Sequence, residues 1–151
     1  MRTLSNKEIR TLSESIHSHY GVFGIIPKKE IIQFNHGMYF SQNQPLLFDH
    51  EGILIPTLKL LAKNQFLKTV EIDKGAIPFM IKGADLMRPG IVSFDPSIEK
   101  NTIVAIVDTV YKKPLAIGKT LYNAAEISTM QKGVIVKNIH YIGDKIWLMK
   151  G

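Results

Sequence analysis

The residues best suited to a chemical role lie in one segment, from Val70 to Gly90, which reads VEIDKGAIPFMIKGADLMRPG. Basic, acidic and apolar residues are interleaved with glycine there. The candidate binding residues are Lys74, Gly75, Ala76, Lys82, Gly83, Ala84, Asp85, Met87, Arg88 and Pro89. Unpaired nucleotides bind to flat apolar surfaces on which their bases stack, with cations beside their phosphates. We therefore interpret this segment as an exposed edge that binds RNA.

Glycines are expected to bracket a short helix in this segment. Gly75 would stand at its start and Gly83 at its end, and the lack of a Cβ lets the backbone come close to a ligand. Backbone N–H groups at the start of the helix can receive a phosphate or a base acceptor. The alternative is that these glycines only serve tight turns.

Side chains after the helix supply charge and apolar surface. A turn at Pro89 and Gly90 is predicted to hold Met87 and Arg88 outward, although Met87 could instead belong to the core. Asp85 has two interpretations, because its carboxylate can accept from a base amino group or cap the following turn. We favour the turn.

A second cluster of polar residues, near the end of the chain, invites a catalytic interpretation. It contains His140, Tyr141, Asp144 and the single tryptophan, Trp147. These side chains can exchange protons, but no residue there offers an activated nucleophile. No histidines or acids have the spacing of a zinc site. We therefore expect a protein that is not an enzyme, with no catalytic residue, cofactor or metal.

The composition favours a globular protein. The chain has 151 residues, 45% of them hydrophobic, and the absence of cysteine excludes disulfides and thiolate sites. No apolar run approaches the roughly 20 residues that span a bilayer, and no secretory signal is recognisable. We expect a cytoplasmic protein with no membrane segment.

The charge favours a polyanionic partner, but only weakly. The formal net charge is +6, with eight basic and five acidic residues up to Lys68 and eleven and eight after it. An RNA surface therefore requires local clusters of cations. The clusters are Lys28 with Lys29, Lys112 with Lys113, and the set of Lys74, Lys82 and Arg88.

The first half is predicted to mix helix and strand. Ser5 and Glu8 have the spacing of a capping box, so a helix should begin there, and Gly21 should end it. A second helix is expected from Pro56 to Asn64, with proline in its first turn and with Leu58, Leu61 and Ala62 facing inward. The strands expected between these helices are 30–34, 38–42 and 46–48, with a hairpin turn at Gly37.

The second half has the strand spacing of a small mixed barrel. No proline, glycine or serine marks a flexible linker near Lys68, so we expect two packed domains, 1–68 and 69–151. Asn123 and Glu126 form a capping box that predicts a brief helix. The other expected elements are strands at 70–72, 91–94, 103–107, 115–121, 134–139 and 145–148, and a short helix at 76–81.

Several stretches carry a resemblance to a known family. Val70 to Gly90 resembles the opening of a PUA domain, a small RNA-binding β-barrel. Thr102 to Val107 (TIVAIV) and Lys132 to Lys150 (KGVIVKNIHYIGDKIWLMK) are similar to the closing half of that domain in the malignant-T-cell-amplified-sequence family of translation factors. Ile26 to Glu30 (IPKKE) and Leu47 to Leu61 (LFDHEGILIPTLKLL) are similar to the N-terminal domain of that family.

The resemblance implies an α+β protein, in which an N-terminal mixed α/β domain packs on a C-terminal PUA barrel. It implies that 70–90 forms an RNA-facing groove, and that the stretch around His140 is barrel core and a closing hairpin that turns at Gly143 and Asp144. The implied ligands are the acceptor end of tRNA or the rRNA of the small ribosomal subunit. The implied protein partner is a protein with an SUI1-type domain, which binds the N-terminal half.

Two other functions stay open. PUA domains are often attached to pseudouridine synthases and transglycosylases, so the chain could be an accessory RNA-binding subunit of an RNA-modification enzyme. Its first half is too short, and has no recognisable pocket motif, to be the catalytic domain. The remaining alternative is a scaffold that binds only proteins.

Overall fold

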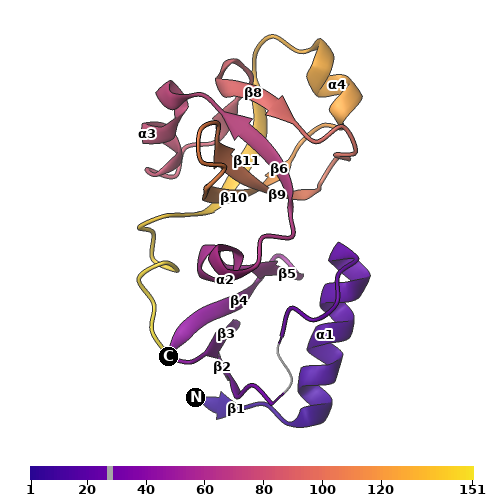
Figure 1. The fold of residues 1–151 in the computed structure, drawn as a ribbon, viewed down its shortest axis with the longest axis vertical. Helices are drawn as coiled ribbons and strands as arrows, with labels where there is room; N and C mark the ends of the chain where they lie inside the picture. Colours follow the sequence, from indigo (N-terminus) through magenta and orange to yellow (C-terminus); the bar gives the residue numbers. More distant parts are fainter. Residues whose placement is uncertain (27–28) are drawn as a thin grey trace. The chain divides into compact units, whose positions relative to one another are not determined.

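A computed structural model describes residues 1–26 and 29–151. The chain forms two compact units, one of residues 1–66 with 148–151 and the other of residues 67–147, whose elements Figure 1 labels. Lys28, predicted to form a basic pair with Lys29, lies outside the described residues, as does part of the IPKKE stretch. Within the described ranges, no helix is both long enough and apolar enough to cross a membrane.

The first helix, α1 (Asn6–Tyr20), has the predicted capping box. The Ser5 hydroxyl accepts from the N–H of Glu8, and the Glu8 carboxylate accepts from the N–H of Ser5, both at 3.1 Å. Gly21 ends the helix in the left-handed conformation, with a φ of 73°. Leu12 and Ile16 are buried on its apolar face, so this prediction is confirmed.

A five-stranded antiparallel sheet lies beside α1, in the order β1-β2-β3-β4-β5. Its strands are β1 (Arg2–Thr3), β2 (Ile32–Asn35), β3 (Met38–Ser41), β4 (Gln44–His50) and β5 (Ile53–Pro56). The predicted hairpin at Gly37 joins β2 to β3, whereas β1 and β5 were not predicted. The core of the unit contains Leu4, Leu12, Ile16, Ile25, Ile26, Ile32, Leu46, Leu47 and Leu60.

The second helix of this unit, α2 (Leu58–Lys63), begins later than predicted. Thr57 is its N-cap, because the Thr57 hydroxyl accepts from the N–H of Leu60 at 3.2 Å. Pro56 ends β5 instead of opening the helix, so that prediction was wrong. Leu58 and Leu61 are buried as predicted, but Ala62 is exposed, and Leu60 is the third buried residue of the helix.

The second unit is a curled six-stranded sheet in the order β7-β11-β10-β9-β6-β8 (Figure 1). Its strands are β6 (Lys68–Ile72), β7 (Leu86–Met87), β8 (Ile91–Phe94), β9 (Ile103–Asp108), β10 (Pro114–Thr120) and β11 (Val134–Tyr141). β6 and β9 run parallel and the other pairs antiparallel. The helix α4 (Ala124–Thr129) has the predicted capping box of Asn123 and Glu126. The α+β fold class is confirmed.

The strand predicted at 145–148 is wrong, and with it the closing hairpin that the resemblance implied. The chain turns after β11, because the Asp144 carboxylate accepts from the N–H groups of Tyr141 and Trp147 at 2.9 and 2.8 Å. His140 is fully buried, and its Nδ1 lies 2.8 Å from Asp144 Oδ2. The turn at Gly143 and Asp144 is therefore present as the resemblance implied, but no strand follows it at 145–148.

Candidate nucleic-acid interface

The segment 70–90 leaves the sheet after β6, rejoins it at β7, which pairs with β11, and leads into β8. Asp73 caps the 3-10 helix η1 (Lys74–Ala76), because its Oδ1 accepts from the N–H of Ala76 at 3.0 Å. η1 continues into one turn of α-helix, α3 (Ile77–Met80). The predicted phosphate contact at this helix start therefore competes with a carboxylate that already uses one of its N–H groups.

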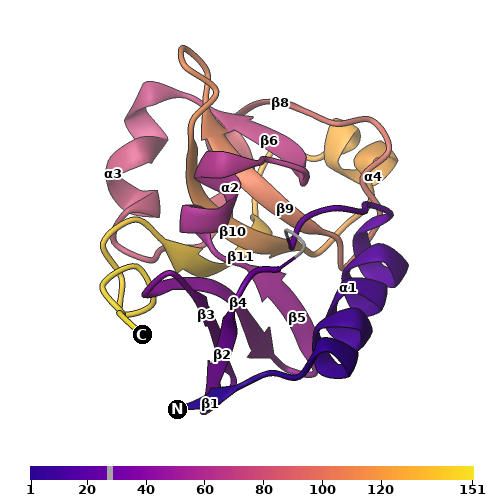
Figure 2. The same cartoon turned by 60° about the horizontal axis from the view of Figure 1, so that its bottom comes forward.

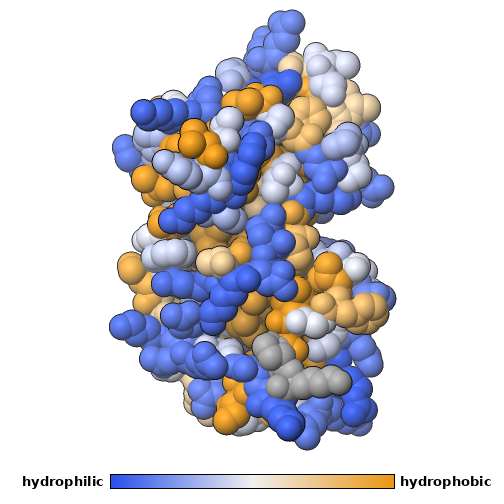
Figure 3. All heavy atoms as spheres, viewed as in Figure 1, coloured by the Kyte–Doolittle hydropathy of each residue, from blue (hydrophilic) through white to orange (hydrophobic). Residues whose placement is uncertain are grey.

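A groove of about 440 Å³ opens between this helix pair and the turn that follows β7. It is lined by Asp73, Gly75, Ala76, Phe79, Met80, Ala84, Asp85, Leu86, Met87, Pro89 and Gly90. The Phe79 side chain is 62% exposed and that of Met87 is 47% exposed, so both offer apolar surface to a ligand. In Figure 3, hydrophobic residues gather among hydrophilic ones where Figure 1 draws α3.

The groove brings together six of the predicted residues, namely Gly75, Ala76, Ala84, Asp85, Met87 and Pro89. It also contains residues that sequence reasoning missed, above all Phe79 and Leu86. No specific signal in the sequence pointed to Phe79, because a helical turn that is apolar on every side is typical of a buried helix. The groove is mostly apolar and of the size that holds small ligands.

Two lysines supply positive charge next to the groove. Lys74 and Lys82 are both exposed; Lys74 lies in η1, between the groove residues Asp73 and Gly75, and Lys82 follows the end of α3. The ammonium group of neither makes a hydrogen bond or ion pair with any residue in 1–26 or 29–151. Both cations are therefore available to phosphates.

Arg88, expected to point outward, is turned into its own unit. Its Nε donates to the carbonyl oxygen of Ile127 at 2.9 Å and its Nη1 to that of Ile91 at 3.4 Å. The guanidinium carbon also lies 5.9 Å from the centre of the Phe94 ring. The outward orientation was wrong, because the carbonyl near the end of α4 attracts the cation.

Asp85 does not cap the turn that follows it, so the prediction that we favoured for this residue was wrong. Its Oδ1 accepts from the backbone N–H of Asn138 at 3.0 Å, and its Oδ2 lies 3.1 Å from Lys137 Nζ. The Asn138 side chain in turn donates to the carbonyls of Met80 and Ala84, at 3.2 and 3.0 Å. These contacts attach the groove wall to β11.

Two glycines allow close packing around the groove. A Cβ on Gly83, whose φ is +90°, would lie 2.9 Å from the ring of Tyr141. A Cβ on Gly90 would lie 3.1 Å from that of Ala76. The turn alternative therefore accounts for Gly83, and Gly90 lets the 3-10 turn η2 (Arg88–Gly90) approach η1.

The polar cluster near the end of the chain is held together by hydrogen bonds to Asp144 and serves the fold. Burial raises the pKa of Asp144, but hydrogen bonds from His140, Trp147 and Tyr141 outweigh it and lower that pKa below its ordinary value. In the part of the chain that the structure describes, no group of three His, Cys, Asp or Glu side chains could hold a metal ion. No catalytic role is assigned to this cluster.

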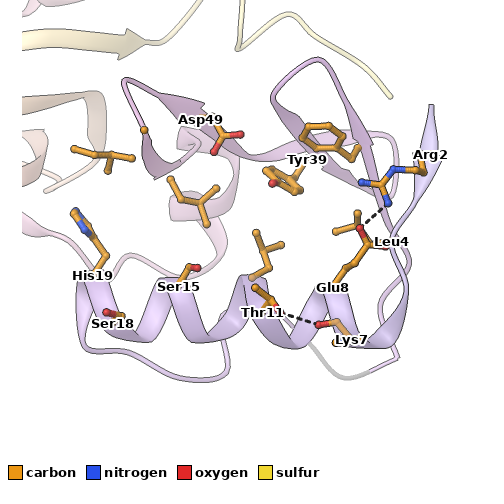
Figure 4. Close-up of a pocket in the computed structure, with 15 residues that line it drawn as sticks. Arg2, Leu4, Lys7, Glu8, Thr11, Ser15, Ser18, His19, Tyr39 and Asp49 are labelled. Carbon is orange, nitrogen blue, oxygen red and sulfur yellow. Dashed lines mark hydrogen bonds and ion pairs between the residues drawn. The ribbon is translucent and has the colours of Figure 1, made fainter.

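A second cavity, of about 610 Å³, lies in the first unit between α1 and the sheet (Figure 4). Its side chains are more polar, and its main charges compensate each other: Arg2 Nη1 lies 2.6 Å from Glu8 Oε2. Burial, with a contribution from Asp49, raises the pKa of the Tyr39 hydroxyl. No residue of the predicted site lies here.

Two family models match the chain. The PUA domain model matches residues 68–142, which include the groove, and the model of a domain of unknown function (DUF1947) matches residues 2–64. An uncharacterised protein of Methanocaldococcus jannaschii is 39% identical over 154 residues, covering 98% of this chain and 95% of the relative.

Two eukaryotic relatives have informative names. Malignant T-cell-amplified sequence 1 of Rattus norvegicus is 37% identical over 136 residues, covering 83% of this chain and 75% of the relative. Translation machinery-associated protein 20 of Saccharomyces cerevisiae is 36% identical over 135 residues, with coverage of 82% and 75%.

Solved structures share the fold. A conserved PUA domain protein from Thermoplasma acidophilum aligns with a TM-score of 0.81 at 29% identity, covering 96% of this chain and 95% of that one. An H/ACA ribonucleoprotein bound to a substrate RNA aligns with a TM-score of 0.52 at 25% identity, over 66% of this chain and 31% of that one.

Proposed function

The chain belongs to the malignant-T-cell-amplified-sequence family of PUA-domain proteins, and we propose that it is a non-catalytic RNA-binding protein that acts in translation. The observation that carries the proposal is the apolar groove within the PUA match, where Phe79 and Met87 are exposed and where the segment that forms the groove also carries Lys74 and Lys82, whose ammonium groups are unpaired within the described residues. Bases stack on such surfaces while cations neutralise their phosphates. The proposed RNA-binding domain is 69–151, with 1–68 as a second domain.

The proposed ligand is an unpaired RNA end, either the acceptor end of tRNA or a single-stranded part of small-subunit rRNA. A groove of about 440 Å³ suits an unstacked nucleotide, whereas the bases of an RNA duplex are not free to enter it. Asp73 and Asp85 also border the groove, and a carboxylate there can accept from a base amino group. Phosphates would therefore lie outside the groove, towards the lysines.

The proposed partners follow from the family. A role in translation supports the small ribosomal subunit as a binding partner and the cytoplasm as its location. A protein with an SUI1-type domain is the proposed partner of residues 1–68. The name of the yeast relative, a translation machinery-associated protein, supports the link to translation.

The alternative is an accessory RNA-binding subunit of an RNA-modification enzyme, such as a pseudouridine synthase or transglycosylase. The likeness to an H/ACA ribonucleoprotein that holds a substrate RNA favours it. Such a subunit would use the same groove but would need a catalytic chain. The two functions therefore differ in what happens to the RNA after binding.

The deciding experiment measures binding of the whole chain to tRNA with and without its 3′ CCA end. We expect tighter binding to the intact end, with an affinity that falls as salt rises and an RNA mass that does not change. Phe79→Ala combined with Met87→Ala should weaken binding. Val92→Ala is the matched control, because Val92 is 54% exposed and lies outside the groove.

Two outcomes would count against this function. Equal affinity for tRNA with and without its end, together with unaltered binding by the groove variant, would exclude the groove as the site. A change in RNA mass after addition of a cell extract, dependent on this chain, would support the accessory subunit instead.

A further inference from the structure

The connection between β9 and β10 (109–113) presents apolar side chains to solvent. Tyr111 is 84% exposed and Val110 is 76% exposed. Figure 2 shows this connection, in orange, projecting beyond the strands that it joins. Both side chains are therefore accessible to a ligand.

The turn is held in one conformation by its own residues. The Asp108 carboxylate accepts from the backbone N–H of Tyr111 at 2.6 Å and from that of Lys113 at 3.1 Å. Asp108 itself is buried, and Lys112 has a left-handed φ of 56°. The Tyr111 ring is therefore presented on a rigid support, which lowers the entropy lost when a ligand stacks on it.

The turn is attached next to the groove. The Thr109 hydroxyl donates to the carbonyl oxygen of Ile72 at 2.8 Å, and Ile72 is paired with Asp108 in the parallel ladder. Asp73, the next residue, lines the groove. The turn and the start of the groove segment thus lie on neighbouring strands of one sheet.

Two lysines follow Tyr111 in the turn. Lys112 pairs with Glu71, whereas the Lys113 ammonium makes no hydrogen bond or ion pair with any residue that the structure describes. Lys74, beside the groove, is likewise unpaired within the described ranges. A free aromatic ring next to free cations is complementary to a single strand of RNA.

We propose that Tyr111 is a stacking platform for a nucleotide that adjoins the one held in the groove, with Lys113 neutralising phosphate between them. The inference rests on the proposed function, because it extends the same RNA site. A strand of RNA is favoured over a protein partner, since the apolar surface at the tip is limited to two side chains and is followed in the turn by the unpaired cation of Lys113.

The test uses two fluorescent RNA ligands, a single adenosine nucleotide that fills only the groove and an octanucleotide ending in CCA. In Tyr111→Ala we expect the octanucleotide to bind roughly five- to a hundredfold more weakly, the usual loss for one stacked base, and the single nucleotide to bind as before. Tyr111→Phe keeps the ring and should bind both like the original chain. Tyr111→Leu keeps apolar area without a flat ring and should resemble Tyr111→Ala.

The groove variant Phe79→Ala with Met87→Ala separates this inference from the function on which it rests. If that variant binds both RNAs as tightly as the original chain, the proposed function fails and the platform with it. If it loses both RNAs while Tyr111→Ala keeps full affinity for the octanucleotide, the platform alone is overturned. Unchanged RNA affinity with altered sedimentation of Tyr111→Ala would assign the turn to contacts between copies of the chain, and would also overturn it.

Discussion

Asp85 accepts a hydrogen bond from the backbone N–H of Asn138 at 3.0 Å, and this contact joins the groove wall to β11. The two residues lie far apart in the sequence, so the contact forms only in the folded unit. A residue first considered as a possible base reader is therefore part of the support of the groove. Its substitution should affect folding as well as binding.

Asp85→Ala is expected to lower the free energy of unfolding by about 1–3 kcal/mol, because a backbone N–H loses a charged acceptor. The measurement is denaturant unfolding followed by the fluorescence of Trp147. Lys137→Ala is the matched control, because it removes only the exposed ion pair of Asp85 and should cost at most about 1 kcal/mol. Equal losses in the two variants would show that the backbone contact contributes nothing.

Arg88→Ala should destabilise the second unit rather than act on RNA alone. The guanidinium donates to the carbonyls of Ile127 and Ile91, so its removal leaves both acceptors without these partners. We expect a loss of about 1–3 kcal/mol in unfolding free energy. A thermal midpoint identical to that of the original chain would show that these hydrogen bonds do not stabilise the unit.

Unlike Arg88→Ala, the variants Lys74→Ala and Lys82→Ala should affect RNA binding and not stability, because neither ammonium makes a hydrogen bond or ion pair with another described residue. Stability should stay nearly constant, while each variant binds RNA more weakly and lowers the slope of log affinity against log salt by about 0.7–1. Lys100→Ala is the control, since Lys100 is exposed and does not line the groove. An unchanged slope in both groove variants would exclude these lysines from phosphate contact.

The lowered pKa of Asp144 leads us to expect that the stability of the folded chain depends on pH. Its pKa is lowered in the folded chain, so the unfolded chain binds the proton more readily and the stabilisation is lost as the pH falls. The contribution is complete above the ordinary aspartate pKa of about 4 and disappears below the folded value. The difference in melting temperature between the original chain and Asp144→Asn should therefore be larger at neutral pH than in acid. A difference that is the same at both would contradict this assignment.

The features that were predicted correctly depend on residues that lie close together in the sequence. The capping boxes at Ser5 and Asn123 and the hairpin at Gly37 each require residues only a few positions apart. Pro56 shows the limit of predicting a helix start from residue type. Proline and threonine both favour this position, and Thr57 is the N-cap because its hydroxyl accepts from the N–H of Leu60.

The sequence predicted which segment contains the candidate site, but not the directions in which its side chains point. Its glycines, apolar residues and cations pointed to 70–90, and the groove lies there. The orientation of Arg88 depends on Ile127, and that of Asp85 on Asn138, partners that no local pattern indicates. Likewise, the turn of Asp144 after β11 replaced an expected strand because the carboxylate binds two backbone N–H groups.

The groove segment starts and ends on adjacent strands, since β6 pairs with β8 and the N–H of Asp73 donates to the carbonyl of Gly90 at 3.0 Å. This loop closes when the sheet itself forms, so its shape is established before any nucleotide arrives. RNA should then bind to a preformed groove. The association rate should depend on diffusion and electrostatic attraction and should not be limited by a slow rearrangement of the protein.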